Sequence, residues 1–194
     1  MSENWPVNLK VGELVLQPLR MRDRIRWQNV RRENRDWLAE WEATLPQVPG
    51  ESESQKLPSF FEMVRWHHRE GRQGRSYALA IWHINSQGKN LIGQITMGGV
   101  MYGAMRGAHI GYWIDRAYAN RGYTTQAVQA VTEFGFNRLK LHRIEINIRP
   151  ENAPSIRVAE KAGYVFEGAR PRYLHIDGNW RDHLCYVKEN TQVI

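Results

Sequence analysis

Short runs in which apolar and polar residues alternate recur along the chain, and they predict the strands of one sheet. The expected strands cover residues 14–19, 76–83, 90–97, 108–114, 143–148, 164–166 and 184–187. The run from Arg143 to Ile148 is the clearest, because every second residue is apolar, as in a strand with one buried face. Asp177-Gly178 is a typical two-residue hairpin turn between the last two strands.

Apolar residues at helical spacing predict five helices between these strands. They are expected over residues 24–33, 36–42, 59–70, 124–139 and 152–162. Asp23 is placed to cap the first helix, and Trp37 and Trp41 would share one face of the second. The prolines and glycine that follow predict a loop that continues to Ser54.

The predicted order of elements is β-α-α-α-β-β-β-α-β-α-β-β, which indicates an α/β domain with helices on both faces of a mixed sheet. The long helix between the strands of Trp113 and Ile146 predicts a right-handed parallel crossover. Ligands of such sheets bind beyond the carboxyl ends of neighbouring parallel strands. A length of 194 residues suits one domain over residues 1–194.

Composition excludes several classes of protein. The chain is 42% hydrophobic and 24% charged, as ordinary globular proteins are. The one cysteine, Cys185, excludes an internal disulfide and a thiolate metal cluster, which suits a reducing cytoplasm. The first residues lack the apolar core of a signal peptide, and no run of 18 apolar residues exists. The histidines show no metal-binding spacing, so we expect no metal site and no membrane association.

The formal charge of +7 is concentrated in one segment. Its arginines are Arg20, Arg22, Arg24, Arg26, Arg31, Arg32 and Arg35. Two interpretations remain open for this segment. It is a solvated helix face, or it is a basic surface that attracts an acidic protein tail, RNA or the phosphate groups of a cofactor.

A short loop joins the strand that ends at Ile114 to the long helix. The loop carries Asn120-Arg121-Gly122, and the helix starts directly after it. The first N–H groups of the helix lack partners and lie at the positive end of its dipole, so they are suited to bind an anion. Amides from Arg121 to Thr125 can hold a pyrophosphate without any particular side chain. A loop that only leads into a helix, and binds no anion, would have the same sequence features.

These features together resemble the GNAT superfamily of N-acetyltransferases over nearly the whole chain. The resemblance rests on the Gly-Tyr-Trp-Ile strand at 111–114, the Arg-Gly-Tyr loop at 121–123 and Pro-Glu-Asn-Ala-Pro-Ser at 150–155. Residues 16–20, 34–42 and 152–168 make the chain similar to the RimJ/RimL-type group, which acetylates the N-terminal alanine or serine of ribosomal proteins. The chain departs from the superfamily loop at Ala119 and Thr124, where Gln or Arg and Gly or Ala are usual.

The resemblance implies a mostly antiparallel sheet of about seven strands, with one parallel, splayed pair that holds acetyl-CoA. The implied cofactor-binding residues are Trp113, Ile114, Arg121, Gly122, Tyr123, Thr124, Thr125, Asn152 and Ser155. Asn152 would contact the pantetheine arm, and Ser155 would lie near the thioester sulfur. Both residues are also favoured helix caps, and the two roles can coexist.

Acetyl transfer to an amine needs a neutral nitrogen. An N-terminal α-amine has a pKa of about 7.7–8.0 and a lysine amine one of about 10.4, so the former needs less help. We expect direct attack in a ternary complex and no acetyl-cysteine, because Cys185 lies on the predicted last strand with no organised histidine directly beside it in the sequence. The catalytic candidates are Ser155, Glu145 and Tyr112, with Tyr173 as a further proton relay. For Glu145, a surface or sheet-edge charge is the more common interpretation of such a position.

The acceptor residues are expected in the second helix. Glu42 would hold the incoming ammonium group, and Trp37 and Trp41 would wall the peptide slot or pack in the core.

The sequence thus predicts an acetyl-CoA-dependent transferase that acts on a protein N-terminus, in the ribosomal-protein-alanine manner. A small amine (polyamine, antibiotic or amino acid) is the alternative acceptor, and an RNA- or ribosome-binding module is an alternative function. Nucleic acid is expected only through proximity to the ribosome, and monomer and homodimer both remain open.

Overall fold

The computed structural model describes residues 4–50, 57–86 and 88–193, and its centre is one eight-stranded sheet. The strand order is β1-β2-β3-β4-β5-β6-β8-β7. The strands are β1 (Leu9–Val11), β2 (Leu14–Gln17), β3 (Tyr77–Asn85), β4 (Gly88–Met101), β5 (Gly107–Ile114), β6 (Arg143–Ile148), β7 (Val165–Ile176) and β8 (Asn179–Glu189). All neighbouring strands are antiparallel except β5 and β6, which are parallel.

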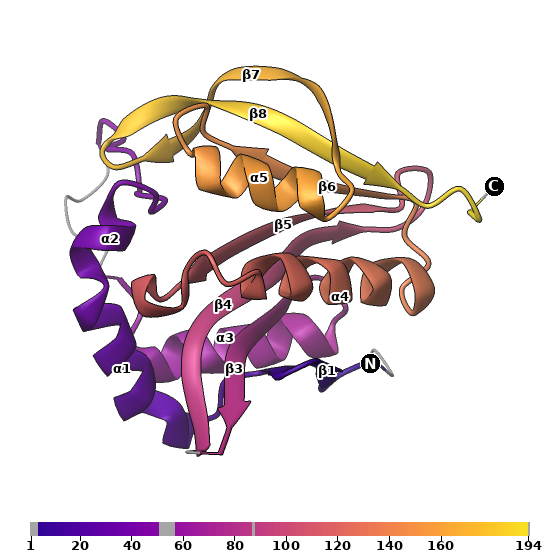
Figure 1. Ribbon diagram of the computed structural model, residues 1–194. Helices are drawn as coiled ribbons and strands as arrows, with labels where there is room; N and C mark the ends of the chain where they lie inside the picture. The colour runs from indigo at the N-terminus through magenta and orange to yellow at the C-terminus, as the bar shows by residue number, and fades with distance from the viewer. Residues whose placement is uncertain (1–3, 51–56, 87, 194) are drawn as a thin grey trace.

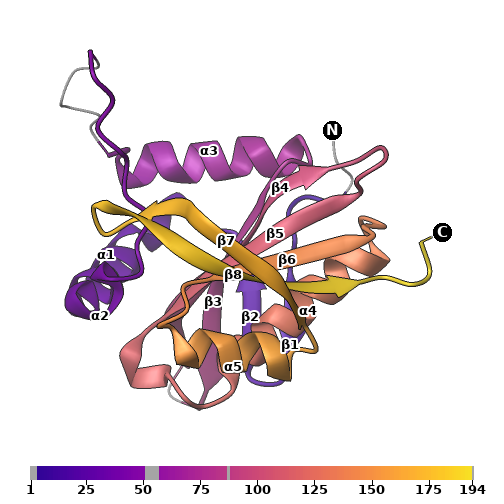
Figure 2. The ribbon, with the colours of Figure 1, turned by 90° about the horizontal axis from the view of Figure 1, so that it is seen from above.

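Helices cover both faces of the sheet (Figures 1 and 2). They are α1 (Arg24–Glu33), α2 (Arg35–Ala39), α3 (Phe60–Arg72), α4 (Tyr123–Asn137) and α5 (Ala153–Lys161), with short 3₁₀ turns η1 (Met21–Asp23) and η2 (Arg116–Tyr118). Figure 2 shows α3 on one side of the sheet and α4 and α5 on the other. Each helix turns its apolar stripe toward the strands, which is the usual way to build such a layered core.

The larger core lies between the sheet and the pair α4–α5. Val128 and Val131 of α4 and Ala159 of α5 pack there against Ile144 and Ile146 of β6. The smaller core lies on the other face, where Val30 of α1 and Phe60 and Val64 of α3 cover Trp82. The face of β5, β6 and β8 opposite α4 and α5 carries polar residues, and these become important below.

The local predictions agree well with the structure. Residues 143–148 form β6 with the predicted alternation of buried and half-buried positions. The parallel pairing of β5 with β6 confirms the crossover through α4. Asp177 and Gly178 both have positive φ, at 47° and 74°, as a type I′ hairpin turn requires.

Three local predictions differ from the structure. The strand β1 was not expected, because three residues are too few to show a pattern. Asp23 is at the N-cap position of α1, but its side chain makes no cap bond there. Its Oδ2 instead accepts the Arg20 N–H at 2.8 Å at the start of η1. The second helix ends at Ala39, so Trp41 lies in the turn after it and shares no helical face with Trp37. The end of the predicted loop at Ser54 lies outside the described residues.

No helix in residues 4–50, 57–86 or 88–193 has the length and apolar character needed to cross a bilayer.

Candidate active site

The two parallel strands pair over a short stretch and then separate. Gly107 to His109 of β5 pair with Arg143 to Glu145 of β6, and beyond that point β5 bonds only to β4 and β6 only to β8. The diverging part of β5 runs to Ile114, and that of β6 runs to Ile148. This leaves backbone groups facing a gap at the carboxyl ends of two parallel strands, where α/β sheets bind ligands.

Hydrogen bonds of the Tyr112 side chain join the two sides of this gap. The Tyr112 hydroxyl of β5 lies 2.8 Å from the Ser155 Oγ of α5, and it also donates to the Ser155 carbonyl at 3.4 Å. Burial raises the pKa of Tyr112 to about 12, against the opposing effect of the Ser155 hydrogen bond. Tyr112 is therefore a neutral hydroxyl at physiological pH, and the pair offers a proton or a hydrogen bond to a group between the strands.

The helix α4 begins at the loop that the sequence singles out. Gly122 is its N-cap residue with φ 78°, and no side chain caps the first turn. A Cβ placed on Gly122 would meet no atom within 4 Å, so open space lies beside the N-cap residue of α4. Arg121 stacks its guanidinium over the Tyr118 ring at 5.3 Å, which keeps a positive charge beside that space. Uncapped amides, the helix dipole and an adjacent cation suit a pyrophosphate.

The first residue of α4 anchors the helix to the strands beside it. The Tyr123 hydroxyl donates to Glu13 Oε2 at 3.0 Å and lies 3.0 Å from His83 Nε2. Glu13 and His83 also contact each other at 3.2 Å. This three-residue contact orients Tyr123 away from the open space, so Tyr123 contributes to the anion site through its backbone.

The start of α5 provides the second polar helix end of the gap. Asn152 Oδ1 accepts the Ser155 N–H at 3.1 Å, so Asn152 does cap α5. The cap leaves the Ser155 hydroxyl for Tyr112. Capping and a place beside the gap therefore coexist in these two residues. The open first turn of α4, the separated strands and the polar start of α5 fit a cofactor with a diphosphate and an extended arm.

A cavity of about 330 Å³ lies on the opposite face of the sheet from α4 and α5. Its floor comes from β4 and β5, through Gln94, Thr96, His109, Gly111 and Trp113. Its wall comes from Arg31, Leu38, Trp41, Glu42 and Ala43, and Tyr112 also borders it. Because Tyr112 borders both the cavity and the gap, an acceptor in the cavity would approach the separated strands directly.

Glu42 and Trp41 belong to this cavity as predicted from the sequence. The Glu42 carboxylate is ion-paired with Arg31 of α1. Arg31 also lies over the Trp113 ring at 5.2 Å, so it links the wall to the floor. Trp41 is covered by the Arg149 guanidinium, 5.0 Å from the ring, and Arg149 donates to the Glu40 carbonyl at 2.6 Å.

The segment after Glu42 is attached to the β7–β8 hairpin. Ala43 forms a bridge with Ile176, and the Thr44 N–H donates to the His175 carbonyl at 2.9 Å. The Asp177 N–H donates to the Glu42 carbonyl at 3.1 Å. These bonds close the far end of the cavity and fix the position of Glu42.

Trp37 takes a different place from Trp41. Its Nε1 donates to the Ile114 carbonyl at 3.1 Å, and Arg116 stacks over its ring at 5.8 Å. It is not among the residues that line the cavity. Trp37 therefore links α2 to the end of β5, and it supports the wall of the cavity without lining the cavity itself.

His109 was not identified from the sequence, although it lies on the cavity floor. Its imidazole packs on Gly98 and Gly99 of β4: a Cβ on Gly98 would lie 3.0 Å from Nε2, and one on Gly99 would lie 2.9 Å from Nδ1. Burial lowers the pKa of His109, against the opposing effect of the Glu145 carboxylate. The feature of the sequence that could have indicated a polar face of β4 here is the alternation of Gln94 and Thr96 with the buried Ile95 and Met97.

Glu145 lies beside His109 on the same face, in register with it. Its carboxylate pairs with Arg143 at 2.9 Å and with Arg170 at 2.8 Å. Burial raises the pKa of Glu145, but the two arginines outweigh it, so the pKa lies below its ordinary value. A carboxylate held by two cations is a weak proton acceptor, so we expect it to act on its neighbours through its charge.

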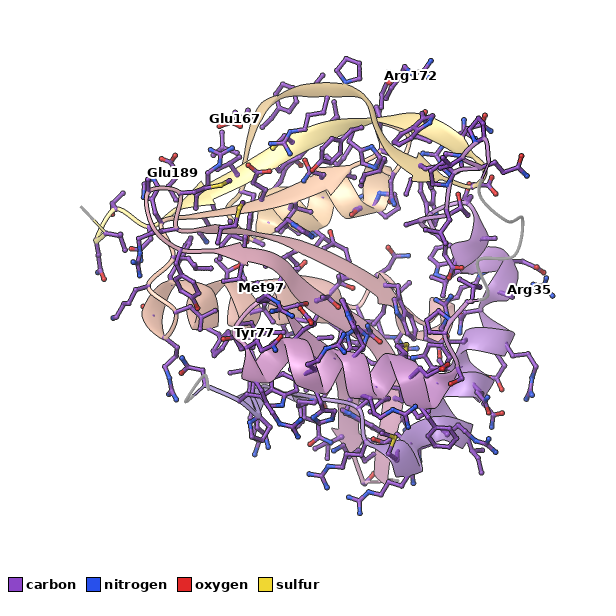
Figure 3. All side chains as sticks on the ribbon, turned by 180° about the vertical axis from the view of Figure 1, so that it is seen from behind. Arg35, Tyr77, Met97, Glu167, Arg172 and Glu189 are labelled. Atoms are coloured by element: carbon purple, nitrogen blue, oxygen red, sulfur yellow. The ribbon has the colours of Figure 1, made fainter. Side chains whose placement is uncertain are left out.

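Cys185 completes this cluster. Its Sγ and the Glu145 and Glu167 carboxylates lie within 4.8 Å of one another (Glu167 is labelled in Figure 3). Burial first, and the neighbouring Glu145 carboxylate second, raise the pKa of Cys185 to about 11, so the sulfur is a thiol. Arg143 and Arg170 already neutralise the two carboxylates, which leaves the group poorly suited to a cation.

Comparison with known proteins agrees with this geometry. The family model described as an acetyltransferase (GNAT) domain matches residues 13–165. A probable N-acetyltransferase of Bacillus subtilis, YjcK, is 30% identical over 177 residues, which cover 90% of this chain and 93% of that protein. The [ribosomal protein uS5]-alanine N-acetyltransferase of Escherichia coli is 29% identical over 182 residues, 92% of this chain and 88% of that protein.

The solved structures include a similar protein that was determined with CoA-disulfide bound. Mycobacterium smegmatis RimJ in complex with CoA-disulfide superposes with a TM-score of 0.82 at 33% identity. The match covers 100% of this chain and 92% of that one.

The environment of His109 predicts that its imidazole is neutral at pH 7. In an NMR titration we expect its midpoint below the ordinary value of about 6.5. The folded protein then binds fewer protons than the unfolded chain in this range, so stability falls as the pH is lowered below 6.5. His109→Gln is expected to reduce this pH dependence of urea unfolding. A midpoint at or above 6.5 would contradict the assignment.

Proposed function

The chain belongs to the GNAT acetyltransferase family, and on that premise we propose that it transfers acetyl from acetyl-CoA to the N-terminal α-amine of a ribosomal protein that begins with alanine. The observation that carries the proposal is the cavity at Glu42, which leads to the separated strands at Tyr112 and Trp113. The similarity to the uS5-alanine enzyme over 92% of this chain supports the choice of acceptor. Such an acceptor would place the protein in the cytoplasm.

Acetyl-CoA supplies an acetyl group activated as a thioester. We assign the diphosphate to the backbone amides from Arg121 to Thr125, with the Thr124 and Thr125 hydroxyls as further donors. The open space over Gly122 and the uncapped first turn of α4 support this assignment. The arm of the cofactor would lie between Trp113–Ile114 on one side and Asn152 on the other. Ala119 stands where Gln or Arg is usual in the family loop, and Arg121, which stacks on Tyr118, would supply the positive charge in its place.

Two sets of groups would carry out the proton transfers, one at the departing sulfur and one at the attacking amine. The Ser155 hydroxyl, backed by the neutral Tyr112 hydroxyl at 2.8 Å, would donate to the sulfur that departs. His109, neutral and on the floor of the acceptor cavity, would receive a proton from the amine through water. Glu145 would stabilise the imidazolium that results, because its negative charge favours protonation of His109. The backbone amides of the diverging part of β5 would polarise the carbonyl.

Glu42 would hold the incoming ammonium group. It is already paired with Arg31, so an acceptor would share this carboxylate or displace Arg31 toward Trp113. A polyamine carries several cations and would meet Arg31 and Arg149 at the cavity wall. A peptide N-terminus brings a single cation, and this difference favours the protein acceptor over the polyamine.

The experiment that tests the proposal measures release of free thiol from acetyl-CoA. Acceptors are ten-residue peptides that begin with Ala, Ser or Met, with spermidine and single amino acids as the small amines. We expect the Ala peptide to give the highest kcat/KM and Glu42→Gln to raise its KM. The conservative control is Glu33→Gln, in α1 outside the cavity. A faster reaction with spermidine, or no reaction with any peptide, would reject the protein acceptor.

The anion site predicts a selective effect of one glycine. Gly122→Ala places a Cβ over the first turn of α4 and strains a residue with φ 78°. Gly178→Ala has a similar strain at φ 74° in a hairpin turn that is remote from α4. We expect acetyl-CoA to raise the melting temperature of the wild type and of Gly178→Ala, and to raise that of Gly122→Ala much less. Equal shifts in both variants would remove Gly122 from the cofactor site.

The Tyr112–Ser155 pair predicts losses in kcat and not in cofactor affinity. Ser155→Ala keeps the Asn152 cap, which uses the backbone N–H, and removes the proton donor. The expected loss is about 10²-fold, at the lower end of general acid–base effects, and Tyr112→Phe should lose less. Thermal shifts with CoA should stay unchanged in both variants. If kcat remains within threefold of wild type in both, the pair has no part in proton transfer.

A further inference from the structure

A second large depression lies away from the cavity, between α3 and the residues that precede α1. It has a volume of about 1610 Å³. We call it the basic groove and define it by Arg20, Met21, Arg65, Trp66, Arg69 and Arg72, all of which line it and are exposed. Figure 3 looks onto this side of the molecule, with α3 in front of the sheet. Nothing in the acetyl-transfer proposal uses this groove.

Four arginines line the groove against one carboxylate, that of Glu62, which already accepts hydrogen bonds from the Ser59 N–H and hydroxyl. Within the described residues, no carboxylate lies within ion-pair distance of Arg20, Arg65 or Arg72. Arg69 contacts Glu70 at 3.5 Å, but Glu70 is bound more closely by Arg75, at 2.6 Å. Arginines that stay in place without acidic partners form a surface that attracts polyanions.

More cations flank the groove on the side of α1. Burial lowers the pKa of Lys89, and the nearby Arg20, Arg22 and Arg26 lower it further, against the opposing effect of Asp23. These four cations therefore share one neighbourhood. Asp23 is buried, and its carboxylate already accepts the Arg20 backbone N–H. A bound anion would relieve this repulsion.

Exposed aromatic rings accompany the cations. Trp66 is 45% exposed in the groove. Phe61, five residues earlier on α3 and outside the residues that line the groove, is 38% exposed. The Arg24 guanidinium lies over the Phe61 ring at 5.5 Å. Flat rings and guanidinium groups along a basic groove are the combination on which single-stranded nucleic acids stack their bases while their phosphates meet the cations. An acidic peptide would use the charges but not the rings.

We propose that the basic groove binds single-stranded RNA next to the acceptor cavity. The α1 helix connects the basic groove with the acceptor cavity. Arg20 and Met21, which line the groove, lie just before this helix, and Arg31 near its end lines the cavity. Its 10 residues span about 15 Å. The choice of RNA over DNA rests on the proposed function, because a ribosomal protein N-terminus lies among RNA. The groove would hold the enzyme on that RNA while the N-terminus enters the cavity.

The test is fluorescence anisotropy with a fluorescein-labelled, 12-nucleotide single-stranded RNA of mixed sequence and the full chain. Four phosphate contacts predict an affinity about fiftyfold weaker at 200 mM than at 50 mM salt. Trp66→Ala should weaken binding about five- to a hundredfold. The variant R65E/R69E/R72E should lose more than tenfold.

The matched control is R138E/K140E/K161E, which changes the net charge equally at the far ends of α4 and α5. It should lose no more than twofold. Equal losses in the two triple variants would overturn the groove as the site, because only total charge would then matter. Equal affinity for DNA of the same sequence would overturn the choice of RNA. Binding of fluorescein-labelled polyglutamate without binding of the RNA would identify an acidic protein as the occupant and reject the proposal.

Acetyl transfer to a free peptide separates this proposal from the proposed function. R65E/R69E/R72E should acetylate the free Ala peptide at the wild-type rate and bind RNA weakly. If the wild type binds RNA through the groove but acetylates no peptide, the groove stands and the ribosomal acceptor fails. If it acetylates the peptide but shows no RNA binding at 50 mM salt, the groove proposal fails alone.

Discussion

The brief pairing of β5 with β6 is the constraint on which the rest of the site depends. Three residues of each strand pair, and then β5 follows β4 while β6 follows β8. Sheet twist and different partners draw the two strands apart. Backbone groups that would otherwise bond across the sheet then need another partner. The helices α4 and α5 start beside the same gap, so their polar ends converge on it. In the proposed site, a cofactor that extends from a diphosphate to a thioester would bind both the helix ends and the unpaired backbone.

Ion pairs decide which polar groups near the gap remain free for chemistry. Glu42 is held by Arg31, and Glu145 is held by Arg143 and Arg170. Both carboxylates suit electrostatic positioning more than proton transfer, because a nearby cation favours their charged form. Tyr112 and Ser155 are neutral and hydrogen-bonded to each other, burial lowers the pKa of His109, and the three residues lie on the two faces that meet at the gap. We therefore assign the proton steps to these three groups.

The acceptor side is built from segments far apart in the sequence. Residues 42–44 bond to the β7–β8 hairpin, Arg149 covers Trp41, and Trp37 bonds to the end of β5. Each contact is modest, since one hydrogen bond contributes about 0.5–1.5 kcal/mol. Together they hold a short helix and a turn that would not keep one position alone. The α1 helix, which lies between this wall and the basic groove, gives the two surfaces a fixed separation.

The sequence alone determined the elements whose signals are local. The alternation at 143–148, the periodicity of α4 and the Asp-Gly turn each depend on neighbouring residues, and the structure has them where they were predicted. The start of α4 after Arg121 and Gly122 could also be predicted locally, because a glycine before a helix needs no distant partner. Only the tertiary structure decided the ion pair of Arg31 with Glu42, the bond from Tyr112 to Ser155 and the packing of His109 on Gly98–Gly99. Those contacts depend on strand register and on how a turn is tied to a remote hairpin, and no periodicity within one segment encodes either.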